Sequence, residues 1–346
     1  MQPERNMTAM RPDTNYVGRL APAPTGALHL GNARTFLIAW LRARLAGGRL
    51  LLRLEDLDHP KVKPHAAVQA YRDLAWLGLD WNEGPAASYP PCREGGDAAD
   101  PFVQSGRVGH YEGFLNNLWD RGLAYPCVCT RKELDSVQSA PNAGEDMREN
   151  RYPGLCRGRF SSLDEAAGAA GGREPGVRFR VGDGARFSFV DGFAGVRDGG
   201  LDEWSGDFLI ARGRRAGYQL AVVVDDHEMG VSEVVRGDDL LASTERQLAL
   251  YNAFGWEAPR FFHVPLVVGP DGRRLAKRHG DTRIGVLRER GAGPGKVLGW
   301  LAWSCGWIGE LREMDLAEIR ETCDFSLLSR SPAVLADADK QWMGFS

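Results

Sequence analysis

The 346-residue sequence lacks the features that place a chain in a membrane, outside the cell or in a repeat array. No stretch approaches the roughly 20 uninterrupted apolar residues that a helix needs to cross a bilayer. Residues 1–14 lack the apolar core of a signal peptide, and no internal repeat is present. We therefore expect a cytoplasmic protein with no membrane partner.

Cysteine is scarce, and half of it is confined to one region. Three of the six cysteines are Cys127, Cys129 and Cys156, a grouping that favours a metal cluster in a reducing compartment over a disulfide framework. An excess of basic residues is also missing. The net charge of −3 argues against a chain coated by nucleic acid, but it leaves room for a local basic face.

What the sequence does contain is typical of a globular protein with two or three domains. Hydrophobic residues make up 43% of the chain, charged residues make up 26%, and 43 glycines indicate many turns. Residues 16–54 show a short apolar strand, a turn rich in glycine and proline, an amphipathic run at 33–45 and a second strand at 50–54. This order predicts a βαβ unit of a parallel sheet.

The rest of the pattern predicts an α/β fold in which a Rossmann-type parallel sheet is interrupted by an insertion and followed by a short helical C-terminal region. Strands are expected at 218–224, 231–236 and 261–268, and helices at 111–121, 243–254 and 297–307. Residues 85–100, 135–149 and 161–176 are expected to be exposed or polar connections. The expected parts are a flexible tail (1–15), two halves of the catalytic domain (16–118 and 201–268), the insertion (119–200) and the C-terminal region (269–346).

The first group of residues with chemical potential is the segment 18–32, GRLAPAPTGALHLGN. Gly26 and Gly31 allow the backbone to approach a nucleotide closely, and a helix that starts near Asn32 directs its positive end at phosphate. His29 is then a candidate donor to phosphate oxygens. A short His-x-Gly motif taken alone favours an ordinary loop in which His29 is a cap or a surface residue.

The wider context resembles the class I aminoacyl-tRNA synthetases, specifically the glutamyl group. The HIGH signature of that class is similar to residues 29–32 and follows a strand that carries Arg19; the KMSKS signature is similar to RLAKR at 274–278. Three further segments follow the glutamyl pattern: RLEDLD at 53–58, YQLA at 218–221 and VVRGDDL at 234–240. Asn32 replaces the last histidine of HIGH, and Ala276 replaces the serine of KMSKS, which removes one hydroxyl donor.

This resemblance implies an interrupted Rossmann-type fold. It also implies that ATP and L-glutamate are substrates and that Mg²⁺ is the ion that neutralises the phosphates of ATP. Glutamate carries two carboxylates and one ammonium, so cationic forks and an anion suit its pocket. The implied glutamate-binding residues are Arg19, Ala23, Glu55, Tyr218 and Arg236. The implied residues for ATP and catalysis are Pro22, Thr25, Gly26, His29, Gly31, Asn32 and Lys277, with Lys277 neutralising the departing pyrophosphate.

Two of these residues have plainer interpretations. Glu55 can be a solvated charge at a strand end beside Arg53, because surface charge pairs are common. Lys277 can belong to a solvated basic turn that spans residues 271–279. The order of the motifs along the chain favours catalysis for Lys277.

The cysteines and Tyr152 form the spacing Cys-x-Cys…Tyr-x3-Cys. Three thiolates can occupy three corners of a tetrahedral zinc site, whereas tyrosine is an unusual fourth ligand, and reduced cysteines without metal are an equal alternative on spacing alone. A narrower resemblance, to the glutamyl-Q tRNA(Asp) synthetases, implies one structural Zn²⁺ held by Cys127, Cys129, Tyr152 and Cys156 in an insertion that faces tRNA.

The same resemblance implies that glutamate is transferred to the queuosine base of tRNA(Asp). Only 69 residues follow Lys277, so we expect no large anticodon-reading region. Two alternatives are a compact glutamyl-tRNA synthetase that charges the 3′ end of tRNA, and a non-catalytic RNA-binding module derived from a synthetase.

Overall fold

The computed structural model describes residues 13–57, 62–85, 100–130, 133–134, 151–275 and 280–345. The contacts among its residues divide the chain into two compact units. Unit 1 comprises Met1–Gly106, Val231–Leu240 and Arg260–Ser346, and unit 2 comprises Arg107–Gly230 and Leu241–Pro259. The five-part domain division expected from the sequence stays a prediction.

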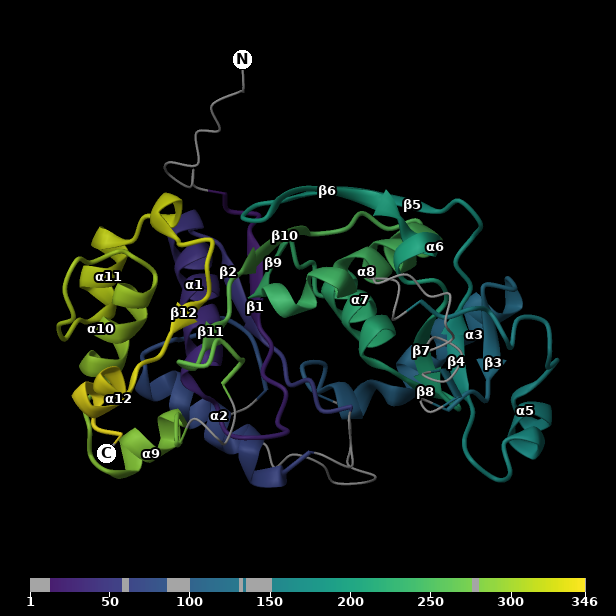
Figure 1. Ribbon diagram of the computed structural model, residues 1–346, viewed down its shortest axis with the longest axis horizontal. Helices are drawn as coiled ribbons and strands as arrows, with labels where there is room; N and C mark the ends of the chain where they lie inside the picture. Colours follow the sequence, from purple (N-terminus) through teal and green to yellow (C-terminus); the bar gives the residue numbers. More distant parts are fainter. Residues whose placement is uncertain are drawn as a thin grey trace, which may run out of the picture. The chain divides into compact units, whose positions relative to one another are not determined.

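Unit 1 begins with the predicted βαβ arrangement (Figure 1). β1 (Val17–Leu20) and β2 (Arg49–Leu52) pair in parallel, and α1 (Leu30–Ala46) connects them. β1 is buried along its whole length, and ten residues of α1 are buried. The βαβ prediction is therefore confirmed.

A second parallel pair joins the first from a distant part of the chain. β9 (Glu233–Gly237) pairs with β10 (Arg260–Val264), and β1 contacts β9. Where these strands meet, the Ser232 backbone N–H donates to the Val17 carbonyl at 2.9 Å, and the Val17 N–H donates to the Ser232 hydroxyl at 2.9 Å. Unit 1 thus brings the carboxyl ends of strands from both parts of the sequence together, the arrangement in which α/β proteins place their ligands.

The remaining elements of unit 1 are mainly helical. α1 and α12 both contact α10, whose Trp300 is fully buried, and β11 pairs in parallel with β12. Their bounds are α2 (Pro64–Trp76), β11 (Val267–Val268), α9 (Ile284–Glu289), α10 (Pro294–Ser304), α11 (Leu316–Thr322), β12 (Ala333–Val334) and α12 (Asp337–Met343), with short 3-10 turns at Asp238–Leu240 and Phe325–Leu327. A further 3-10 turn, Gln104–Arg107, ends at the first residue of unit 2. The predicted helix at 297–307 corresponds to α10.

Unit 2 is built on an antiparallel sheet of the order β3-β4-β7-β8 and a separate hairpin, β5–β6. The bounds are α3 (Val108–Asp120), β3 (Ala124–Cys127), α5 (Leu163–Ala169), β4 (Gly176–Phe179), β5 (Arg186–Asp191), β6 (Gly195–Gly200), α6 (Leu201–Trp204), β7 (Phe208–Arg212), β8 (Arg215–Ala216), α7 (Tyr218–Glu228) and α8 (Leu241–Phe254). α3 and α8 confirm the predicted helices at 111–121 and 243–254.

Two predictions of secondary structure are wrong. The strand expected at 218–224 is the first part of helix α7, whose residues Leu220 to Asp226 are all buried. Burial on every side removes the polar face that marks a helix, so a short apolar run rich in valine looks like a strand. The polar connection expected at 161–176 contains α5, which Ser162 caps by accepting from the Glu165 N–H.

Other predicted segments fall wholly or mostly outside the described residues, among them 135–149 and most of 85–100. The strand expected at 261–268 is present as β10 followed by β11. None of the helices in the described ranges is long and apolar enough to cross a bilayer.

Candidate functional site

The loop that follows β1 in unit 1 is held against the segment that follows β2. The Arg53 N–H donates to the Leu20 carbonyl at 2.9 Å, and the Glu55 N–H donates to the Pro22 carbonyl at 3.1 Å. Pro22 is buried, whereas Ala23, Thr25 and Gly26 are exposed. The loop is therefore fixed by its backbone and offers its small side chains to the surface of unit 1.

His29 ends this loop as the N-cap of α1. Its Nδ1 accepts from the N–H groups of Gly31 at 3.1 Å and Asn32 at 3.4 Å, and the Asn32 side chain accepts in return from the His29 N–H at 3.4 Å. His29 and Asn32 thus form a capping box, which satisfies backbone donors that a helix start leaves unpaired. With Nδ1 accepting, the neutral imidazole carries its proton on Nε2.

The protonation state of His29 follows from this environment. Burial, and secondly the charge of Arg274, lower the pKa of His29 to about 4. The ring is consequently neutral at pH 7. Both interpretations of His29 from the sequence are compatible with this geometry, since capping uses Nδ1 and leaves Nε2 as a donor.

The two glycines of the loop differ in their surroundings. A Cβ on Gly31 would lie 3.1 Å from the His29 ring, so the absence of a side chain there makes room for the cap. A Cβ on Gly26 would meet no atom of the described residues within 4 Å. The sequence predicts that both glycines let the backbone approach a ligand closely. Of the two, only Gly26 has open space beside it.

The segment resembling KMSKS is described only at its edges, and Ala276 and Lys277 lie outside the described residues. On its N-terminal side, Arg274 Nη1 donates to Asp239 Oδ2 at 2.7 Å. On its C-terminal side, the Leu30 N–H donates to the Thr282 carbonyl at 3.1 Å, and the Ile284 N–H donates to the Leu28 carbonyl at 2.9 Å. The chain therefore returns from this segment directly beside His29.

Arg19 and Arg236 lie on neighbouring strands of unit 1, and each is only 5% exposed. Arg19 Nη1 donates to the Val235 carbonyl at 3.4 Å, next to Arg236 in the chain. Arg236 Nε donates to His263 Nε2 at 3.0 Å, and its guanidinium lies over the Phe261 ring at 5.4 Å. Arg19 thus contacts the backbone of β9, and the Arg236 guanidinium lies against side chains of β10.

Glu55 and Tyr218 complete the predicted glutamate-binding set, together with Ala23. Glu55 Oε1 pairs with Nη2 of the fully buried Arg53 at 2.9 Å, and its side chain is only 11% exposed. Glu55 is therefore not a solvated surface charge. Tyr218 belongs to unit 2, where it is the first residue of α7 and is partly buried.

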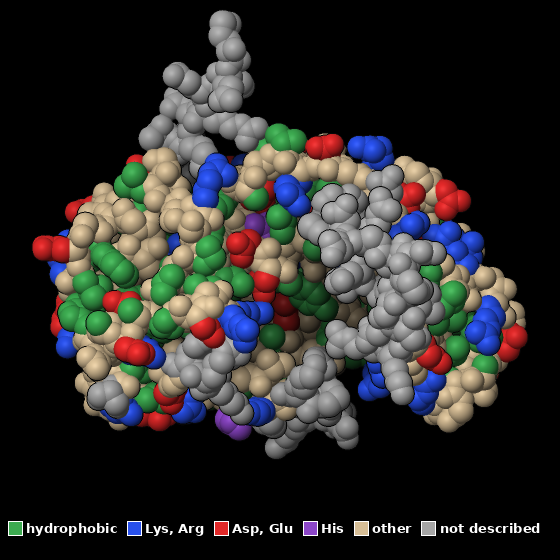
Figure 2. Space-filling view, viewed as in Figure 1, with side chains coloured by type: hydrophobic (Ala, Val, Ile, Leu, Met, Phe, Trp, Pro, Cys, Tyr) green, Lys and Arg blue, Asp and Glu red, His purple; other side chains and the backbone are tan. Residues whose placement is uncertain are grey.

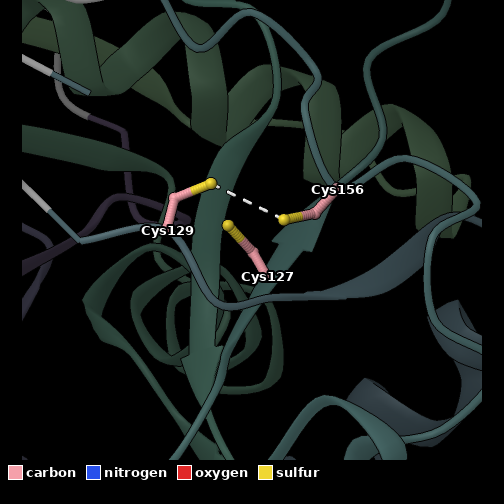
Figure 3. Close-up of side chains that lie close together, drawn as sticks. All are labelled: Cys127, Cys129 and Cys156. Carbon is pink, nitrogen blue, oxygen red and sulfur yellow. Dashed lines mark hydrogen bonds between the residues drawn. The ribbon is translucent and has the colours of Figure 1, made fainter. Parts of the chain in front are cut away.

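The metal-ligand candidates lie together in unit 2. The sulfur atoms of Cys127, Cys129 and Cys156 point toward one another and lie within 4.8 Å of one another (Figure 3). Cys129 Sγ lies 3.6 Å from Cys156 Sγ. The Tyr152 hydroxyl oxygen lies 3.4 Å from Cys127 Sγ and 3.5 Å from Cys129 Sγ, and it accepts from the Cys156 N–H at 2.9 Å.

The environment of this cluster contains a residue that sequence reasoning missed. Arg178, on β4, is 7% exposed, and its Nε donates to Cys127 Sγ at 3.2 Å. Its guanidinium carbon lies 3.6 Å from the centre of the Tyr152 ring. No motif marks Arg178, because its contacts depend on the pairing of β4 with β3, where Arg178 lies opposite Tyr125.

A cavity of about 780 Å³ opens beside the cluster within unit 2. Cys127, Cys129 and Arg178 are among its lining residues. The other lining residues include Arg173, Arg212 and the partly exposed Leu209, with Glu174 as an acidic neighbour. The described lining of the cavity, here named the basic wall, carries three arginines and one glutamate. It is therefore locally basic, although the whole chain carries a net charge of −3.

The molecular surface carries charges of both signs. On the face shown in Figure 2, acidic and basic side chains are interspersed among apolar ones. This distribution agrees with a small net charge and with local rather than general attraction for polyanions.

Comparisons with known proteins give a consistent result. A family model described as the catalytic domain of class I tRNA synthetases (E and Q) matches residues 16–340. The chain is 45% identical to the glutamyl-Q tRNA(Asp) synthetase of Symbiobacterium thermophilum over 316 residues, which is 91% of this chain and 94% of the relative.

Two further proteins are similar over a smaller share of their own length. The glutamate–tRNA ligase 2 of Syntrophus aciditrophicus is 40% identical over 327 residues, which is 94% of this chain and 65% of the relative. A crystal structure of a glutamate tRNA ligase from Elizabethkingia meningosepticum, in complex with its amino acid, superposes with a TM-score of 0.75 at 25% identity, over 95% of this chain and 68% of that one. The α/β fold expected from the sequence is thus that of the class I synthetases.

Proposed function

Because the chain belongs to the class I tRNA synthetases for glutamate and glutamine, and within them to the glutamyl-Q tRNA(Asp) synthetases, we propose that it activates L-glutamate with ATP and transfers the glutamate to the queuosine base of tRNA(Asp). One observation carries the proposal: three relatives with that name are 42% to 46% identical and match over 86% to 98% of their own length.

The reaction has two group transfers. A carboxylate oxygen of glutamate attacks the α-phosphorus of ATP, and the bond to pyrophosphate breaks, which gives glutamyl-adenylate. A hydroxyl of the queuosine cyclopentene ring then attacks the adenylate carbonyl, loses its proton, and AMP leaves. The protein supplies binding, orientation and electrostatic stabilisation for both steps.

We assign ATP binding to the loop around α1. His29 is neutral at pH 7, its Nδ1 is engaged in the cap, and its Nε2–H is the group we assign to a phosphate oxygen. The backbone at Gly26 has room for close approach, and Pro22, Thr25, Gly31 and Asn32 shape the loop and the helix start. Lys277 is assigned to the departing pyrophosphate as a compact positive charge.

We assign glutamate to Arg19, Ala23, Glu55, Tyr218 and Arg236. The burial of Arg19 and Arg236 supports this assignment, because a desolvated guanidinium binds a carboxylate more strongly than an exposed one. Glu55 forms an ion pair with Arg53, and we assign its carboxylate to the ammonium group of the glutamate substrate. Mg²⁺ is proposed for the phosphates of ATP, and no residue of the chain is assigned to it.

We propose that Cys127, Cys129, Tyr152 and Cys156 hold one structural Zn²⁺. Tetrahedral zinc with bonds of about 2.3 Å to sulfur and about 2.0 Å to oxygen requires sulfur–sulfur distances of about 3.8 Å and sulfur–oxygen distances of about 3.5 Å. The distances of 3.6, 3.4 and 3.5 Å in the cluster fit these values. Four protein ligands leave no position for substrate, so bound zinc would contribute folding energy to this part of unit 2.

The tRNA is proposed to contact unit 2 at the basic wall of the cavity beside the cluster. Arg173 and Arg212 line that wall. Arginine side chains can bind the phosphate groups of an RNA backbone through two parallel hydrogen bonds. Because ATP and tRNA are the proposed substrates, we also propose a cytoplasmic location.

The test of the function is to identify the acylated nucleotide. The protein is incubated with ATP, labelled glutamate and tRNA(Asp) with or without queuosine, and the product is digested to nucleosides. Label on queuosine, and none in tRNA that lacks it, is expected. Label on the 3′-terminal adenosine would instead show a glutamyl-tRNA synthetase, and the absence of glutamate-dependent ATP–pyrophosphate exchange would show a non-catalytic module.

A further inference from the structure

Arg178 is buried beside the cysteine cluster with an unusual set of partners. A buried guanidinium is costly unless its charge and its donors are compensated. Arg178 Nε donates to Cys127 Sγ at 3.2 Å, Nη1 donates to the Asp207 carbonyl at 2.8 Å, and the guanidinium covers the Tyr152 ring at 3.6 Å. Two of these three partners are proposed zinc ligands.

Asp207 connects Arg178 with a second arginine. The Asp207 carboxylate, 2% exposed, accepts from Arg157 Nε and Nη2, both at 2.6 Å, and Arg157 directly follows Cys156 in the chain. The same carboxylate accepts from the Val181 N–H at 2.8 Å and from the Tyr125 hydroxyl. Asp207 therefore fixes Arg178 through its carbonyl and Arg157 through its carboxylate.

The backbone before Asp207 holds the segment of Tyr152. The Tyr152 N–H donates to the Ser205 carbonyl at 3.3 Å. Gly206 has φ +57°, and a Cβ at this position would lie 2.7 Å from the Tyr152 carbonyl oxygen. Residues 205–207 thus contact the segment of Tyr152, the residue after Cys156, and the arginine that touches Cys127.

We propose that Arg178, anchored by Asp207, is a positioning residue for the zinc cluster: it holds Cys127 and Tyr152 in ligating positions and thereby slows the loss of the metal. This inference rests on the zinc site of the proposed function. Groups that orient metal ligands change metal affinity by about 10- to 100-fold when they are removed. Arg157 performs the equivalent task for the loop that carries Cys156.

The test measures zinc release from the full-length protein. Zinc-loaded protein is mixed with an excess of EDTA, and the zinc that remains bound is followed over time. R178Q is expected to release zinc about 10- to 100-fold faster than wild type. R178K keeps the charge but lacks the planar fork, so an intermediate rate is expected. R180Q is the matched control, because Arg180 lies on the same segment but is exposed, and it should release zinc at the wild-type rate.

A second readout separates positioning from general stability. Cobalt(II) in place of zinc reports the thiolate ligands through its absorption bands, and loss of the Arg178–Cys127 hydrogen bond should shift the thiolate-to-cobalt band in R178Q but not in R180Q. If R178Q does not fold, R178K provides the same two comparisons.

If wild type binds zinc, but R178Q and R178K both keep the wild-type rate of zinc release and the wild-type cobalt spectrum, this inference alone is overturned. Equal acceleration in R180Q and R178Q would also overturn it, because a general charge effect would then explain the result. Wild-type protein purified without zinc would overturn the zinc site itself and this inference with it.

Discussion

The start of α1 in unit 1 and the cysteine cluster in unit 2 both hold polar groups in fixed positions, but they do so over different distances in the sequence. In the first region, His29 and Asn32 cap each other across three residues. In the second, Cys127 and Tyr152 are 25 residues apart, and Arg178 reaches Cys127 from 51 residues away. The first region is a local structure, and the second depends on how the strands of unit 2 pair.

This difference predicts two kinds of mutational effect. In unit 1, substitution of a proposed ligand-binding side chain should leave the fold intact, so the variants should change chemistry. A cluster assembled from distant segments should lose local structure when one ligand is removed. Substitutions in the two units test this contrast, and the largest effect is expected at a buried arginine of unit 1.

Arg236→Ala should have the largest effect, a loss of about 1000-fold in glutamate-dependent ATP–pyrophosphate exchange. Arg236 is only 5% exposed. Removing a desolvated partner of a carboxylate costs several kcal/mol, and a cost of about 4 kcal/mol corresponds to a roughly 1000-fold loss of rate. Arg19→Ala should behave in the same way. Exchange kinetics and thermal unfolding are measured for each variant, and an unfolding temperature close to that of wild type is expected.

The matched control is Arg260→Ala, because Arg260 lies at the start of β10 but is 61% exposed. It should retain exchange activity. A normal exchange rate in Arg236→Ala at ordinary glutamate concentrations would remove Arg236 from the proposed pocket.

Lys277→Ala should lower kcat of the exchange reaction by about 100-fold with a smaller change in KM. The reason is that its contact with pyrophosphate is expected to strengthen in the transition state, as negative charge builds up on the departing group. Arg273→Ala, an exposed neighbour in the same basic turn, is the control and should change little. Equal effects of the two substitutions, or an effect on KM alone, would support a solvated basic turn.

The same contrast explains how much could be predicted from the sequence. The βαβ unit was predictable because its strands and helix show their period locally, and the His29 and Asn32 pair lies within one helical turn. The strand predicted at 218–224 was wrong because α7 is buried on all sides, which no local pattern reveals. Likewise, the cysteines were visible as a group, whereas Arg178 and Asp207 look like ordinary charged residues until β4 and β7 pair.

Cys127→Ser should remove most of the zinc and lower transfer of glutamate to tRNA by about tenfold, while adenylate formation falls by less than about threefold. The reason is that the cluster organises unit 2, whereas His29 belongs to unit 1. Metal analysis, exchange and transfer are measured on the same preparation. Cys323→Ser, outside the cluster, should match wild type in all three; zinc-free but fully active wild type would identify a reduced structural cluster without metal.

The smallest effect concerns the pH dependence of stability at His29. The pKa of His29 is lowered to about 4 in the folded protein, first by burial and then by Arg274, and it is about 6.5 in the unfolded chain. The unfolded state therefore binds more protons between these values, so the free energy of unfolding falls as the pH drops from about 6.5 towards about 4. The full shift corresponds to about 3 kcal/mol, and solvent screening of this partly exposed ring reduces it to about 1 kcal/mol.

Asn is a good N-cap that does not titrate, so His29→Asn should lose less stability than wild type between pH 7.5 and pH 4.5 in urea unfolding. His65→Asn, which changes an exposed histidine on α2, should follow the wild-type curve. Parallel curves for wild type and His29→Asn would show that the cap at α1 does not depend on a neutral imidazole.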